Sequence, residues 1–89
     1  MLLQLPSTLS FAQVRPTLAQ LEGVLREPGE ALAVDVSALQ HFDSSALAVL
    51  LECRRKAMAA GKTLKIQGLS PRLQELAKLY GIDALLYPG

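Results

Sequence analysis

The chain has 89 residues, of which 51% are hydrophobic and 4% aromatic, and nine basic residues against eight acidic ones leave a net charge of +1. This balance gives no field that would attract nucleic acid or an anionic membrane, and so few aromatic rings give no stacking platform for bases. We expect a single domain over residues 1–89, because a chain of this length builds one hydrophobic core.

Three further features bear on the location of the protein. The longest apolar run, residues 46–51, is far shorter than the ~20 residues of a membrane-spanning helix. The N-terminus has neither the basic start nor the apolar run of a signal peptide. The lone cysteine, Cys53, cannot form an intramolecular disulfide. We therefore expect a soluble cytoplasmic protein with no direct membrane insertion.

The first part of the chain predicts a short strand and a helix. Residues 2–5 form an apolar run typical of an edge strand. Ser10 and Gln13 have capping-box spacing, and the helix that follows them ends at Pro28-Gly29. Its apolar side chains recur at helical intervals: Phe11, Val14, Leu18, Leu21 and Leu25. Pro16 leaves two alternatives, a helix kinked at this residue or a helix that starts there.

The middle of the chain predicts a strand, a loop and a long helix. Residues 31–36 are almost continuously apolar, as expected of a strand in a sheet that is covered or flanked on both faces. The loop 37–42 carries Leu39 and Phe42, which we expect to fill the core. Residues 44–60 then form the strongest helical pattern of the chain.

The last part repeats this alternation. Gly61 ends the long helix, and the alternating residues 63–67 predict a second clear strand. Ser70-Pro71 is an N-cap followed by a proline suited to the first helical position, and Gly81 ends the helix that starts there. Residues 82–87 are a tail that forms a last short strand or a turn. Strands alternating with helices favour an α/β fold with a mostly parallel sheet.

Side chains for metal binding or catalysis are scarce. Cys53 and His41 are the only residues of their types, so no pair has metal-ligand spacing, and the glycine-rich loops of nucleotide sites are absent. Ser44 and Ser45 closely follow His41, but neighbours in sequence seldom point at one another as a hydrolase triad requires. Catalysis by these residues is the weakest alternative. We expect no metal, no cofactor and no enzymatic activity.

The motif Asp43-Ser44-Ser45 begins the long helix. One interpretation is N-capping, in which an oxygen of Asp43 or Ser44 accepts a hydrogen bond from a free backbone amide and stabilises the helix by about 1 kcal/mol. The other is a docking or modification site, because free amides and the positive end of the helix dipole tolerate a phosphate on a displayed hydroxyl. A cap needs one side chain only, so the second serine favours the site.

The faces of the long helix extend this second interpretation. Cys53 shares a side with small apolar residues, and we expect it in the core. Another apolar stripe, with Arg54 beside it, follows one flank: Leu47, Leu51 and Met58. This flank either packs on a neighbouring helix or forms an exposed seam for a partner. The expected partner-binding residues are Asp43, Ser44, Ser45, Leu47, Leu51, Arg54 and Met58.

Taken together, these elements resemble a STAS domain, the domain of bacterial anti-sigma-factor antagonists and of several transporter-associated proteins. The resemblance covers nearly the whole chain, with a shorter N-terminal strand region than usual. The C-terminal half is most similar to the small STAS subunit of the Mla phospholipid-transport ABC system of Gram-negative bacteria. The matching stretches are residues 47–51, 64–68 and 76–81, of which Leu-Ala-Lys-Leu-Tyr is the most specific.

The resemblance implies the STAS fold, a small mixed sheet with helices on one side. For the transport subunit it also implies a partner, the cytoplasmic ATPase of the transporter, which in turn sits on an inner-membrane permease. The subunit would then be cytoplasmic and peripheral to the inner membrane. It has no catalytic residues, and would support the assembly and activity of a complex that maintains outer-membrane lipid asymmetry.

The motif itself is similar to two subfamilies. Ser44 matches the hydroxyl residue, usually Thr, that follows the Asp of the transport subunit, and Ser45 matches the serine that antagonists present to their kinase. Both subfamilies usually have Gly where this chain has Ala46, and the transport subunit usually has Gly at the position of Ser45. The longer helical match favours the transport subunit. The alternative is an anti-sigma-factor antagonist switched by phosphorylation at Ser45.

Overall fold

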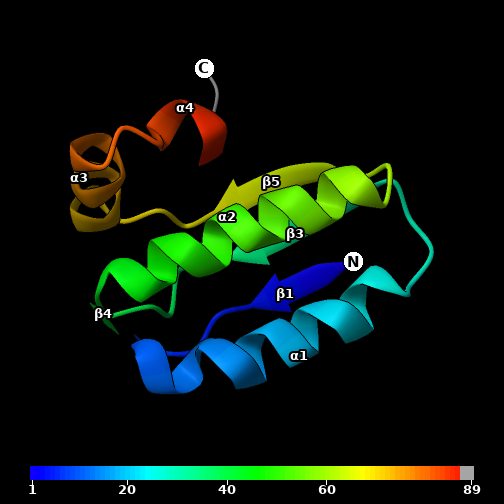
Figure 1. Cartoon of the computed structure of the whole chain (residues 1–89), viewed down its shortest axis with the longest axis horizontal. Helices are drawn as coiled ribbons and strands as arrows, with labels where there is room; N and C mark the ends of the chain where they lie inside the picture. Colours follow the sequence, from blue (N-terminus) through cyan, green and yellow to red (C-terminus); the bar gives the residue numbers. More distant parts are fainter. Residues whose placement is uncertain (87–89) are drawn as a thin grey trace.

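The computed structural model describes residues 1–86, in which strands alternate with helices (Figure 1). In chain order the elements are β1 (Leu2–Gln4), β2 (Thr8–Leu9), the 3-10 helix η1 (Phe11–Gln13), α1 (Val14–Leu25), β3 (Ala31–Asp35), β4 (His41–Phe42), α2 (Ser44–Ala59), β5 (Thr63–Gln67), α3 (Pro71–Leu79) and α4 (Asp83–Leu86). The α/β class and the strand–helix alternation predicted above are confirmed.

The main sheet has three strands in the order β1-β3-β5, and both pairs are parallel. In register, Leu3 lies opposite Val34, which lies opposite Ile66. Because parallel neighbours need a crossover, α1 connects β1 to β3 and α2 connects β3 to β5. The segments β2 and β4 form a separate parallel pair of two residues each, beside the start of α2.

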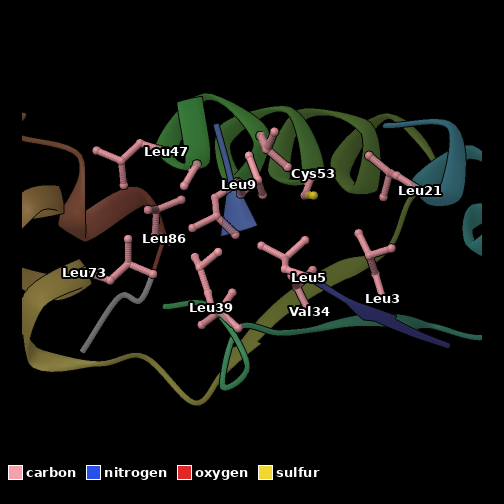
Figure 2. Packing of buried hydrophobic residues seen from close by; sticks show 14 of the residues in the cluster. Leu3, Leu5, Leu9, Leu21, Val34, Leu39, Leu47, Cys53, Leu73 and Leu86 are labelled. Atoms are coloured by element: carbon pink, nitrogen blue, oxygen red, sulfur yellow. The ribbon is translucent and has the colours of Figure 1, made fainter. Parts of the chain in front are cut away.

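One face of the sheet carries the core. Leu3 and Val34 are buried on the side where α1 and α2 pack (Figure 2), and Leu32, two residues before Val34 on β3, is buried as well. The alternate residues of β3, which include Ala33 and Asp35, are half-buried or exposed. The apolar run 31–36 therefore does not reflect a sheet buried on both faces. Alanine, which loses little by partial exposure, fills the outer positions, and the helices lie on one side as the STAS resemblance implies.

The ends of the later helices follow the predicted signals. The Ser70 hydroxyl accepts a hydrogen bond from the amide of Leu73, 3.2 Å away, and caps α3. Gly61 and Gly81 have positive φ angles of 70° and 71° and follow α2 and α3. In each case the next amide returns to the helix, as when Lys62 N–H donates to the carbonyl of Ala57. This is the Schellman geometry that favours glycine.

The N-terminal helix begins differently from the prediction. Ser10 and Gln13 form the capping box, but it starts the short η1 rather than α1. Pro16 is the third residue of α1 and lies in its first turn, where a helix needs no amide donor. Phe11 does not belong to the buried stripe, because in η1 its side chain is 85% exposed.

Two segments have more structure than was expected. The predicted loop 37–42 includes β4, while Leu39 in it is buried and Phe42 half-buried against the core. The predicted strand or turn after Gly81 is instead the short helix α4, whose Leu86 enters the core. Tyr87, the last residue of that predicted tail, lies outside the described residues.

Three glycines provide a graded test of the backbone. Gly68 has φ +77°, and a Cβ there would lie 2.7 Å from Cβ of Ser37, so Gly68→Ala should lower the free energy of unfolding by about 2 kcal/mol or more. Gly61 has φ +70° in open space, and Gly61→Ala should cost about 1 kcal/mol. Gly23 lies inside α1 with open space around it, and Gly23→Ala should stabilise by about 0.5–1 kcal/mol.

Urea denaturation of the three variants and the parent chain measures these differences. Equal losses for Gly61→Ala and Gly68→Ala would contradict the close approach of Gly68 to Ser37.

Candidate functional site

In the motif at the start of α2, Asp43 caps the helix and the two serines do not. Asp43 is the N-cap, and its Oδ1 accepts a hydrogen bond from the backbone amide of Ser45 at 2.8 Å. Ser44 and Ser45 are the first two residues of the helix; Ser44 is exposed and Ser45 partly exposed. Because the carboxylate already caps the helix, neither hydroxyl is needed for capping.

A groove of about 470 Å³ lies beside this motif, between the start of α2 and the helix α3. Its lining residues come from β4, the N-terminus of α2 and α3: Phe42, Asp43, Ser44, Arg72, Glu75, Leu76 and Leu79. The Arg72 guanidinium lies 5.1 Å from the centre of the Phe42 ring, a cation–π distance that connects α3 to β4. The motif and α3 therefore form one continuous surface.

The charges in the groove are incompletely balanced. Asp43 and Glu75 form no ion pair with another residue of the described part of the chain, where the ion pairs are Arg55–Glu52 and Lys56–Glu22. The third charged residue, Arg72, faces the Phe42 ring. The groove thus presents two carboxylates next to apolar side chains. By contrast, Lys56 on the α1 side of α2 donates to Glu22 and lowers the pKa of that carboxyl.

For Leu47 the structure decides between the two alternatives left open for the apolar flank: this residue packs on a neighbouring helix and is not part of an exposed seam. Its side chain is only 2% exposed, because α4 packs against α2 and brings Leu86 beside it (Figure 2). The prediction treated residues 82–87 as a tail and so missed the element that covers Leu47. This residue therefore stabilises the fold and presents almost no surface to a partner.

The rest of the predicted flank is more accessible. Met58 is 59% exposed, whereas Leu51 and Arg54 are half-buried. They share the flank of α2 that also carries Leu47, so the accessible part of this flank is shorter than the full stripe from Leu47 to Met58. The groove beside Asp43 and the flank at Met58 are separated along α2, because nearly the full length of the 16-residue helix lies between them.

The remaining reactive side chains are not gathered into a catalytic arrangement. Cys53 is fully buried, and burial, aided by the nearby Glu52 charge, raises the pKa of its thiol to about 12, so it is not a nucleophile at neutral pH. His41 is exposed in β4, and within residues 1–86 it shares no hydrogen bond with either serine of the motif. In the same residues no group of three His, Cys, Asp or Glu side chains is placed to hold a metal ion.

Sequence reasoning missed the contribution of α3 to the site. Arg72, Glu75 and Leu79 line the groove, although nothing in their spacing relates them to Asp43, about 30 positions earlier. One signal was available in Leu79, which lies outside the apolar stripe of its own helix and is 79% exposed. Together with Phe42 and Leu76 it forms a contiguous apolar area, which is typical of a surface that something else covers.

The sequence was compared with models of known protein families. The family model described as Mlab, STAS domain, matches residues 1–87. The chain belongs to the STAS domain family. No curated protein matches it. The family supports a general role in protein interaction for this STAS domain. Among its described helices, none has both the length and the hydropathy needed to cross a bilayer.

The division between core and groove predicts a contrast between two leucines of this STAS domain. Leu47→Ala should lower the free energy of unfolding by about 2–5 kcal/mol, because it removes buried methyl groups and leaves a cavity beside Leu86. Leu79→Ala should change it by less than about 0.5 kcal/mol, since the side chain is mostly in solvent. Chemical denaturation gives both values, and comparable losses would place Leu79 in the core.

Proposed function

We propose that this STAS domain is the non-catalytic subunit of a phospholipid-trafficking ABC transporter of the Mla type. In this role it binds the cytoplasmic ATPase and is held near the inner membrane through the ATPase and its permease. It supports the assembly and activity of a complex that maintains outer-membrane lipid asymmetry. The family model that matches the chain is described as Mlab-type, and the transport-like stretches of the C-terminal half agree with it.

The observation that carries the proposal is the exposed surface formed by the Asp43-Ser44 corner and α3. Ser44 is exposed at the helix start, and Leu79 leaves most of an apolar side chain in solvent beside it. An apolar area flanked by polar groups is a common interface layout. Most of the chain's transport-like stretch Leu76–Gly81 belongs to the same helix, so the surface and the resemblance coincide.

The first test is co-purification of the chain with the ATPase encoded beside it. We expect the parent chain to form a stable complex and Ser44→Arg to weaken it at least about tenfold, because a long cation would project from the helix start into the interface. A matched control is Gln20→Arg on the exposed surface of α1, which should bind like the parent. Absence of any complex with the parent chain would refute the transport role.

A second candidate function is that of an anti-sigma-factor antagonist. The observation in its favour is the position of Ser45, partly exposed in the first turn of α2, where the positive end of the helix dipole favours a negative charge. An added phosphate would lie near the Asp43 carboxylate that bonds the Ser45 amide, and its charge would weaken docking of a partner. Phosphorylation would then act as an off-switch.

Mass spectrometry after incubation with the cognate anti-sigma kinase tests this alternative. The expected result is one phosphate on the parent chain and on Ser44→Ala, and none on Ser45→Ala. An unmodified parent chain would exclude the antagonist role. The Ser44→Ala variant serves as the matched control, because it removes a neighbouring hydroxyl and leaves the Asp43 cap in place.

A further inference from the structure

The groove between α2 and α3 has a chemistry that restricts what binds it. We propose that its occupant is a segment of the partner protein that inserts one apolar side chain between Leu76 and Leu79 and places a Lys or Arg against Asp43 and Glu75. This inference rests on the proposed transport role for its partner, the ATPase. It adds the type of side chains that the partner must present.

The apolar side chains of the groove remain partly exposed to solvent in the isolated chain. Phe42 and Leu76 are half-buried and form its inner wall, while Leu79 is 79% exposed at its rim. These three side chains come from β4 and α3 and leave a hollow large enough for an aliphatic side chain. A partner that inserts such a side chain removes apolar area on both surfaces from water.

The charges decide between a cation and an anion on the partner. Two carboxylates line the groove, and neither is neutralised by an ion pair within residues 1–86. The single cation, Arg72, is directed to the Phe42 ring at 5.1 Å. One oxygen of Asp43 is also engaged by the Ser45 amide, which holds that carboxylate in a fixed position. The net charge of the lining is negative, so it complements a Lys or Arg and repels an acidic segment.

The position of Arg72 also explains why Glu75 is not paired within the groove. Arg72 and Glu75 are three residues apart on α3, a spacing at which opposite charges pair readily. In this structure Arg72 stacks over Phe42 instead, and Glu75 keeps its charge in solvent at the groove. The cation–π contact thus leaves the carboxylate available to a partner.

The experiment measures binding of the full chain to the purified ATPase at several salt concentrations. Glu75→Lys should raise the dissociation constant at least about tenfold, and Glu75→Gln should weaken binding less and flatten its salt dependence. Leu79→Ala should weaken binding about tenfold with the salt dependence unchanged. The matched control is Glu30→Lys, an identical charge change on an exposed residue before β3, at the far end of the sheet from the groove (Figure 1).

A charge swap completes the test. Each exposed Lys or Arg on the ATPase surface is changed to Glu, and one such change should restore binding to Glu75→Lys. Wild-type binding by both Glu75→Lys and Leu79→Ala would overturn the inference and leave the transport role standing, whereas failure of the parent chain to bind would refute that role. The inference would also be overturned if the parent chain self-associates and Glu75→Lys abolishes this self-association. In that case the occupant of the groove would be a second copy of the chain.

Discussion

The packing of α2 on the sheet is the constraint on which the rest of the structure depends. Its inward side chains are buried where α2 packs against α1, β5 and α4, and they include three small ones: Ala46, Val49, Leu50, Cys53 and Ala57. Small residues let the helix backbone approach the sheet closely, so the rotation of α2 about its axis has little freedom. That rotation determines where its first turn points. With the stripe buried, Ser44 faces solvent and Leu47 faces the C-terminal helices.

The C-terminal helices α3 and α4 complete the groove beside the first turn of α2. The chain leaves β5 at Gly68, whose positive φ and close approach to Ser37 set the direction toward α3. Gly81 then reverses the chain so that α4 returns to α2 and Leu86 is buried. The result is that α3 is held at both of its ends, with Arg72 over Phe42 near the first. The groove owes its shape to these attachments rather than to any single residue of the motif.

Local signals predicted most of the fold. The helix from 44, the strand 63–67 and the cap at Ser70 were all readable, because each depends on residues within a few positions of one another. The groove and the burial of Leu47 could not be predicted from such local signals. Both depend on contacts between α2 and residues 30 to 40 positions later, which periodicity along one helix does not contain. The two-residue strand β4 was missed for a related reason, since its partner β2 lies more than 30 positions earlier.

The cap at Asp43 has a consequence for how such proteins diverge. The first turn of α2 is secured by a carboxylate one residue before the helix, and the amide of Ser45 is bonded whatever side chain that residue carries. Positions 44 and 45 are consequently free to change during evolution at little thermodynamic cost to the scaffold. A duplicated gene could exchange a threonine, serine or glycine there and acquire a new client while inheriting the same architecture.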